Sequence, residues 1–204
     1  MLYPHDHFYP RFERLLGEIA NGPLVLDLGT YHALRKELAH HRSLFRNHYF
    51  TMDRSYEPGA PGPDVVGDIS RLPFESRSAD AIICKEVLEH VRDPGRAMSE
   101  MHRVLKTGGA LLCTVPFLHP YHGKKGYLHD FWRFTEEGVA ELFSGFSSVE
   151  IERAGGAMFV LRAFSPAIPR AVFFSPLLAP IVNALDRLSM RWGASHLFMV
   201  LARK

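Results

Sequence analysis

The sequence of 204 residues lacks several features that would assign a chain to a class of proteins at once. No apolar run reaches the roughly 20 residues that a helix needs to cross a bilayer. Residues 1–6 have neither the basic start nor the apolar core of a signal peptide, so we expect none and expect a cytoplasmic protein. The net charge is only +2 and the basic residues are scattered, which argues against a nucleic-acid-binding surface.

Cysteine is also scarce. Cys84 and Cys113 each lie inside an apolar run that is typical of a central strand, so we expect two small buried thiols in a reducing cytosol. The hydrophobic content of 47% and the charged content of 23% are those of an ordinary soluble globular domain.

Short apolar runs alternate with amphipathic segments, which indicates an α/β fold with a doubly wound sheet and helices on both faces. We expect strands at 24–29, 49–53, 64–69, 79–86, 110–115, 149–152 and 196–202, and helices at 7–21, 32–43, 93–105 and 135–143. The chain, 1–204, is expected to be a single domain. An apolar insertion at about 165–192 precedes the last strand, and we interpret it as a helical cap on the sheet or a dimer contact. The alternative is a surface that touches membrane or covers an apolar substrate.

Three successive expected strands end in or near an acid, namely Asp27, Asp53 and Asp68. Open parallel sheets bind ligands at the carboxyl ends of their strands. A carboxylate after the second strand can accept both ribose hydroxyls, and a polar side chain after the third can meet an adenine amine. One such acid alone is more often a helix cap or a turn former, but three in succession favour a nucleoside site.

Five segments resemble motifs of the class I S-adenosylmethionine-dependent methyltransferases (methyltransferase type 11-like): 25–29, 52–53, 67–74, 80–91 and 103–109. The resemblance implies a Rossmann-like seven-stranded sheet, mostly parallel with an antiparallel last strand. It also implies S-adenosyl-L-methionine as cofactor and an in-line methyl transfer at a sulfonium carbon, in a dry and aligned site. The cofactor-binding residues that it implies are Asp27, Gly29, Thr30, Asp53, Arg54, Asp68, Ile69 and Lys85.

The first motif departs from the family, which usually has two further glycines where this chain has Tyr31 and Ala33. Those glycines let the backbone approach the methionine part of the cofactor. Tyr31 could turn its ring outward or occupy that space. The alternative function is therefore an inactive methyltransferase-like binding or scaffold protein with a degenerate cofactor motif. A nicotinamide-dependent oxidoreductase is disfavoured because its Gly-x-Gly-x-x-Gly turn is absent.

The family builds its acceptor site partly from the loop after the fifth strand, which here is the aromatic, histidine-rich stretch 117–133. Residues 117–120 and 129–135 resemble a pattern of family members that occur with sugar and cell-surface biosynthesis. We expect His129, Asp130 and His119 to be catalytic, because a histidine–aspartate neighbourhood can supply a base for an alcohol or phenol. An equally weighted alternative for His129 is that it braces the loop by hydrogen bonds, and this is the preferred role for Arg133.

The expected function is thus transfer of a methyl group, as O-methylation, to a small-molecule, sugar or lipid-linked acceptor. Peripheral membrane contact or a homodimer through 165–192 is a further expectation.

Glu86, Glu89 and His90 form a Glu-x-x-Glu-His motif. A similar motif, joined by a later histidine, holds a divalent metal in ubiquinone-pathway and small-RNA methyltransferases, and these residue types suit such an ion. The same letters occur in members without a metal, where Glu89 and His90 orient the loop beside the cofactor. We favour that interpretation and expect no metal.

Overall fold

The structure is a computed structural model that describes residues 8–20, 22–29, 48–54, 62–124, 128–165 and 177–204. Its strands are β1 (Leu24–Leu28), β2 (His48–Asp53), β3 (Val65–Val66), β4 (Ala79–Lys85), β5 (Leu105–Pro116), β6 (Ser148–Ala154) and β7 (Leu197–Arg203). Its helices are α1 (Phe8–Ile19), the short 3-10 helix η1 (Leu88–His90), α3 (Pro94–Val104), α4 (Glu136–Leu142), α5 (Ala157–Phe164) and α7 (Ala179–Arg191).

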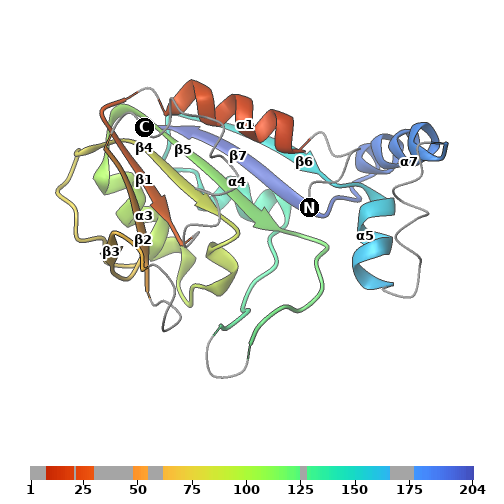
Figure 1. The fold of residues 1–204 in the computed structure, drawn as a ribbon, viewed down its shortest axis with the longest axis horizontal. Helices are drawn as coiled ribbons and strands as arrows, with labels where there is room; N and C mark the ends of the chain where they lie inside the picture. The colour runs from red at the N-terminus through yellow and green to blue at the C-terminus, as the bar shows by residue number, and fades with distance from the viewer. Residues whose placement is uncertain (1–7, 21, 30–47, 55–61, 125–127, 166–176) are drawn as a thin grey trace.

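The seven strands form one sheet in the order β3-β2-β1-β4-β5-β7-β6 (Figure 1). The first five in this order pair in parallel, and β7 is antiparallel to both β5 and β6. The predicted α/β fold, mostly parallel with an antiparallel last strand, is therefore confirmed. The expected helix at 32–43 lies outside the described residues.

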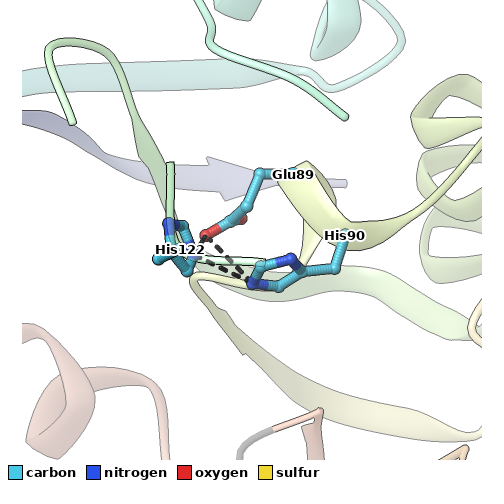
Figure 2. Close-up of side chains that lie close together, drawn as sticks. All are labelled: Glu89, His90 and His122. Atoms are coloured by element: carbon cyan, nitrogen blue, oxygen red, sulfur yellow. Dashed lines mark hydrogen bonds and ion pairs between the residues drawn. The ribbon is translucent and has the colours of Figure 1, made fainter. Parts of the chain in front are cut away.

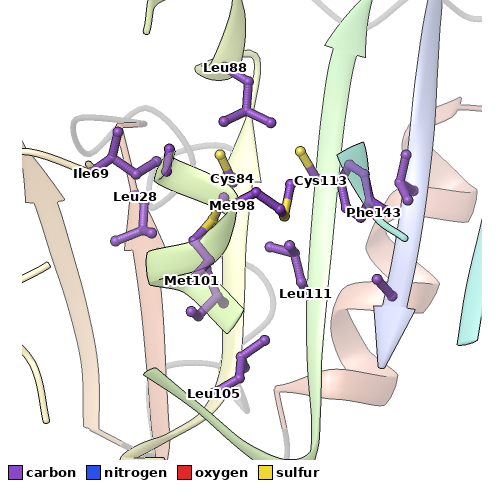
Figure 3. Close-up of a cluster of buried hydrophobic side chains, with 14 of the residues drawn as sticks. Leu28, Ile69, Cys84, Leu88, Met98, Met101, Leu105, Leu111, Cys113 and Phe143 are labelled. Carbon is purple, nitrogen blue, oxygen red and sulfur yellow. The ribbon is translucent and has the colours of Figure 1, made fainter. Parts of the chain in front are cut away.

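Two hydrophobic cores cover the two faces of the sheet. On one face, α1 packs Phe12 and Leu16 against the strands. On the other, α3 and α4 enclose a cluster that contains Cys84 and Cys113 (Figure 3). The two cysteines are free and fully buried on adjacent strands, as predicted, and burial raises the pKa of the Cys113 thiol well above its usual value.

Helices α3 and α4 begin where their local sequences direct. Asp93 accepts a hydrogen bond from the backbone N–H of Arg96 at 2.9 Å, and Pro94 follows at the first helical position. Thr135 accepts one from the N–H of Gly138 at 3.1 Å. Both helix starts match the sequence-based expectation.

Two strands, β3 and β5, differ most from their predicted bounds. β5 begins at Leu105, because Leu105 already pairs with Ala79 of β4. Further along β5, Gly108 N–H donates to the Lys204 carbonyl at 2.9 Å. β3 contains only Val65 and Val66, since the chain turns away after Gly67 to form the bend at Asp68.

The predicted insertion contains α7, and a further helix that the sequence did not indicate, α5, precedes it. Figure 1 shows the pair beyond the ends of β6 and β7, at the edge of the molecule. The helices meet closely: Met158 N–H donates to the Asp186 carboxylate at 2.7 Å, and a Cβ on Gly156 would lie 2.4 Å from the Asp186 carbonyl oxygen. Among the described residues, no helix is long and apolar enough to cross a membrane.

Candidate functional site

A cavity of about 480 Å³ lies at the carboxyl ends of β1, β2 and β4. Fifteen residues line it: Gly29, Met52, Asp53, Arg54, Gly67, Asp68, Ile69, Ser70, Glu86, Val87, His90, Val91, Arg92, Leu128 and His129. It occupies the edge at which open parallel sheets bind ligands.

Five of the eight residues predicted to bind the cofactor line this cavity, namely Gly29, Asp53, Arg54, Asp68 and Ile69. Thr30 lies outside the described residues, as do Tyr31 and Ala33. Lys85 and Asp27 do not line the cavity, so direct cofactor contacts by them stay a prediction that this geometry does not support. Asp68 also stabilises a turn, which is the alternative role considered for it from the sequence. Its Oδ1 accepts a hydrogen bond from Ser70 N–H at 2.7 Å.

Gly29 allows the backbone to approach the cavity wall. Its φ is +81°, in the left-handed region, and a Cβ there would lie 2.6 Å from Cγ2 of Val87. Its N–H donates to the Met52 carbonyl at 2.7 Å, which holds the end of β1 against β2. The turn after β1 therefore requires glycine for two independent reasons.

Asp27, the buried acid of β1, has a side-chain partner inside the protein. The Tyr49 hydroxyl donates a hydrogen bond to Asp27 Oδ2, and the aspartate is fully buried. This bond offsets part of the cost of burying a carboxylate. Sequence reasoning missed it, because the register of β1 against β2 brings the two residues together.

Glu86 is a cavity residue that was not among the predicted cofactor ligands. It adopts φ +54°, a conformation that costs a non-glycine residue roughly 1–2 kcal/mol. Its N–H is held by Thr114, at 3.1 Å from both the carbonyl and Oγ1. The strain places Glu86 at the end of β4, on the cavity wall.

The loop after β5 is braced by one ion pair. Arg133 donates to both oxygens of Asp130, at 2.6 and 2.8 Å, and also to the carbonyls of His119, Pro120 and Trp132. The bracing role expected for Arg133 matches these contacts.

Asp130 does not have the properties of a base. Its hydrogen bonds from Arg133 hold the pKa of the carboxyl well below its usual range, and its side chain has no exposed surface. These contacts favour a bracing role for Asp130, and a catalytic role for it stays a prediction.

The two predicted catalytic histidines lie in different places. His129 lines the cavity and stacks on Phe131 at 5.2 Å. His119 is half-buried between the rings of His122 and His196, and burial lowers its pKa. It does not line the cavity, so only His129 has direct access to a ligand there; a catalytic role for either stays a prediction.

Glu89, His90 and His122 converge beside the cavity (Figure 2). Nε2 of His90 lies 3.1 Å from Nε2 of His122, and Glu89 Oε1 lies 3.8 Å from each. Glu89 is 1% exposed, and neither carboxylate oxygen has a hydrogen-bond partner among the described residues. Burial raises the pKa of Glu89 to about 8 and lowers that of His90.

The motif weighed from the sequence is only partly reproduced in this cluster. Glu86 lies on the cavity wall and takes no part, whereas His122, which the sequence did not single out for this role, supplies the third group. The loop returns to η1 because Phe131 N–H donates to the Glu89 carbonyl at 2.7 Å and Trp132 Nε1 to the Val91 carbonyl at 2.8 Å.

Residues 35–113 match a family model described as a methyltransferase domain. The chain is 33% identical over 95 residues to 2-methyl-6-phytyl-1,4-hydroquinone methyltransferase 1 of Oryza sativa subsp. japonica, covering 45% of this chain and 28% of that protein. It is 41% identical over 59 residues to demethylmenaquinone methyltransferase of Renibacterium salmoninarum, covering 29% and 24%. The matches thus span less than a third of either relative's length.

Solved structures match over nearly the whole chain. An S-adenosylmethionine-dependent methyltransferase from Mesorhizobium loti superposes with a TM-score of 0.59 at 18% identity, covering 96% of this chain and 97% of that one. Another from Archaeoglobus fulgidus gives 0.62 at 14%, covering 97% and 93%. At such identities the likeness concerns the fold. The fold is thus that of the solved S-adenosylmethionine-dependent methyltransferases, and the central residues of the chain are similar to a methyltransferase domain.

Proposed function

We propose that the chain transfers the methyl group of S-adenosyl-L-methionine to a hydroxyl group of a small or lipid-linked organic acceptor. The observation that carries this proposal is the cavity at the ends of β1, β2 and β4, with Asp53 and Asp68 on its wall. A volume of about 480 Å³ lies in the range of small-molecule sites.

The residues present fit such a cofactor. Asp53, at the end of β2, offers carboxylate oxygens for two ribose hydroxyls. Asp68 and Ile69 line the same cavity and would contact the adenine. Gly29 leaves open the space that a Cβ would fill beside Val87. When bound, the cofactor supplies an electrophilic methyl group.

The chain's own contribution is to bind, align and keep the site dry. Val87, Val91 and Leu128 give the cavity apolar walls that exclude water. His129 lines the same cavity and would accept a proton from an acceptor hydroxyl. Turnover by a His129→Ala variant equal to that of wild type would remove His129 as the base.

For the acceptor we propose a hydroxylated ring, free or carried on a lipid or sugar. The names of two groups of relatives specify a hydroquinone or demethylmenaquinone as the acceptor. Both acceptors contain a ring, which supports the proposal of a ring substrate. A screen of phenol, quinol and sugar acceptors with methyl-labelled cofactor tests this, and transfer only to nitrogen or carbon would overturn O-methylation.

Calorimetry tests the cofactor directly. Wild type is titrated with S-adenosylmethionine and S-adenosylhomocysteine, beside Asp53→Asn, which loses an acceptor of ribose hydroxyls, and Glu137→Gln, which loses an exposed charge on α4. We expect Asp53→Asn to bind about 10-fold or more weakly, which corresponds to one charge-assisted hydrogen bond, and Glu137→Gln to bind like wild type. Absence of heat with either ligand at millimolar concentration would favour an inactive binding or scaffold protein.

We also propose that the protein works in the cytoplasm, at an anionic lipid surface, through the α5–α7 face, defined by the exposed side chains of Leu161, Phe164, Leu177, Leu178, Ile181, Leu185, Leu188 and Trp192. On α7, the spacing from 181 to 192 places Ile181, Leu185, Leu188 and Trp192 on one side of the helix. Such a large exposed apolar surface marks an interaction site.

The charges on these two helices favour lipid over a second copy of the chain. Arg187 and Arg191 are exposed on α7. Asp186 is the single acidic residue of α5 and α7, and its carboxylate accepts a hydrogen bond from Met158 N–H between the two helices. Cations beside an apolar face suit anionic headgroups and would repel a second copy of the same face.

Co-sedimentation with neutral and anionic vesicles tests this surface, with Leu185→Glu as the disrupting variant and Glu137→Gln as the control. We expect wild type and the control to sediment with anionic vesicles and Leu185→Glu to remain in solution. A concentration-dependent dimer that Leu185→Glu dissociates, without vesicle binding, would show the face to be a homodimer contact instead.

A further inference from the structure

We propose that Glu89, His90 and His122 bind a first-row divalent metal ion through Glu89 Oε1 and the two Nε2 atoms. Zn²⁺ is the ion used below to compare distances and to test binding. This reverses the metal-free expectation from the sequence. Binding of the ion does not depend on the methyl-transfer function; its role in that reaction does.

Hydrogen-bond partners assign the tautomers of both histidines. Nδ1 of His90 lies 2.5 Å from the His129 carbonyl oxygen, which can only accept, so the proton of the neutral ring is on Nδ1. Nδ1 of His122 faces two acceptors, the Pro120 carbonyl at 3.3 Å and Asp130 Oδ2 at 3.4 Å. Its proton therefore also belongs on Nδ1.

These tautomers leave a lone pair on each Nε2, and the two atoms face one another at 3.1 Å. Glu89 Oε1 adds a third electron-rich atom at 3.8 Å from both. A cation between these three atoms would be attracted to all of them and would offset their mutual repulsion (Figure 2).

The separations suit a metal. Ligand atoms about 2.0–2.1 Å from a tetrahedral Zn²⁺ lie about 3.3–3.4 Å from one another. The observed 3.1, 3.8 and 3.8 Å lie on either side of that value, so shifts of a few tenths of an ångström would complete the site. Two imidazoles and one carboxylate are ligands that zinc and its neighbours accept.

The surroundings have the features of a built site. Glu89 is 1% exposed, and among the described residues its carboxylate oxygens have no hydrogen-bond donor, so a cation would supply the missing partner. The Nδ1 atoms of both histidines face the carbonyl or carboxylate groups that commonly orient metal-bound imidazoles.

Three protein ligands leave a coordination position open, as in catalytic rather than structural zinc sites. His90 belongs to the cluster and also lines the cavity, so the ion lies next to the space for the acceptor. Within the proposed function, the ion would hold the acceptor oxygen and lower the pKa of its hydroxyl, and His129 would accept the proton.

Metal binding can be measured without cofactor or acceptor. Untagged protein freed of metal with a chelator is titrated calorimetrically with ZnCl₂, and the visible spectrum is recorded with CoCl₂. The variants are Glu89→Gln, His90→Gln and His122→Gln, and the matched control is His102→Gln, which removes a part-buried histidine of α3 outside the cluster.

We expect one ion per chain in wild type and in His102→Gln, with a cobalt spectrum of a low-coordinate nitrogen and oxygen site. Each ligand variant should bind zinc more than about 100-fold more weakly, because even partners of metal ligands are worth about 10–100-fold. Circular dichroism verifies folding of each variant.

Wild type that takes up no stoichiometric ion would overturn the proposal, and so would folded ligand variants that bind as tightly as wild type. If the variants fail to fold, X-ray absorption of the zinc-loaded wild type decides: two imidazole ligands support the site, and their absence overturns it. A negative result would leave the methyl-transfer proposal intact, because cofactor binding is measured separately.

Discussion

At the scale of single residues, the site contains backbone conformations and buried groups that are unfavourable elsewhere in a protein. Gly29 is left-handed and close to Val87, Glu86 is held in a strained conformation, and Glu89 is buried without a hydrogen-bond donor among the described residues. All three positions lie at or beside the same cavity. Such concentration of strained and unsatisfied groups is typical of a functional site.

Replacing Gly29 by alanine is expected to weaken cofactor binding. The positive φ costs about 1–2 kcal/mol with a Cβ, and the methyl group would push Val87 toward the cavity. Calorimetry with S-adenosylhomocysteine should give an affinity at least about 10-fold lower. The control is Gly17→Ala on α1, where the Cβ meets nothing within 4 Å. Equal affinities for both variants would contradict the close approach.

His196 is expected to make stability depend on pH. Its ring is 5% exposed between His119 and Phe159, and burial lowers its pKa to about 3. In the unfolded chain the imidazole of His196 takes up a proton near pH 6.5, whereas in the folded protein it stays neutral down to about pH 3. The free energy of unfolding therefore falls as the pH drops below about 6.5. At pH 5 the loss is on the order of 2 kcal/mol.

The matched variant is His196→Phe, which keeps a ring at this position but does not titrate. When the pH is lowered from 7.5 to 5, the free energy of unfolding measured in urea should fall by on the order of 2 kcal/mol more for wild type than for the variant. Parallel pH profiles would show that His196 is not the group responsible.

At the scale of elements, the site is assembled from two segments that hold each other. η1 and the loop after β5 are joined by the hydrogen bonds of Phe131 and Trp132 to η1, and Arg133 braces the loop internally. These contacts bring His122 to Glu89 and place His129 on the cavity wall. The element pair α5 and α7 is held similarly, by the close approach of Gly156 to Asp186.

Replacing Gly156 by alanine should separate these two helices. The new Cβ would lie 2.4 Å from the carbonyl oxygen and 2.6 Å from Cα of Asp186, and backbone atoms cannot rotate away. We expect a loss of about 1–3 kcal/mol in the free energy of unfolding. Hydrogen exchange should show α5 and α7 less protected and α1 unchanged.

Gly145→Ala is the control, because its Cβ would meet nothing within 4 Å. Stability and exchange like those of wild type are expected for it. The same result for Gly156→Ala would mean that the helices adjust without cost, contrary to this packing.

At the scale of the whole molecule, β7 inserts the last described residues between two strands that precede it in the sequence. It lies between β5 and β6 and is antiparallel to both, so its side chains are buried by residues far away in sequence. Phe198 of β7 is 2% exposed and packs 5.6 Å from the ring of Phe117, whereas Phe164 on the α5–α7 face is 56% exposed.

The two phenylalanines provide a matched comparison. Phe198→Ala should lower the free energy of unfolding by about 3–5 kcal/mol, because it removes a buried ring and leaves a cavity. Phe164→Ala should change it by less than about 0.5 kcal/mol in the isolated protein. Urea denaturation measures both, and a large loss for Phe164→Ala would show that this face is already covered.

Much of the fold follows from local patterns. The apolar runs locate β1, β2, β4, β6 and β7, and the caps at Asp93 and Thr135 locate α3 and α4, since strand period and capping depend on neighbours in the sequence. The acids at strand ends likewise indicate the nucleoside edge, and Asp53 and Asp68 do line the cavity.

The sequence by itself thus determined the class of fold and the edge of the sheet at which the cavity lies, because hydrophobic period and strand-end chemistry are local properties. Only the tertiary structure decided which groups meet: Tyr49 with Asp27, Arg133 with Asp130, and His122 with Glu89 and His90. Those pairs depend on strand register and on the return path of a loop without regular period, and no local pattern encodes either.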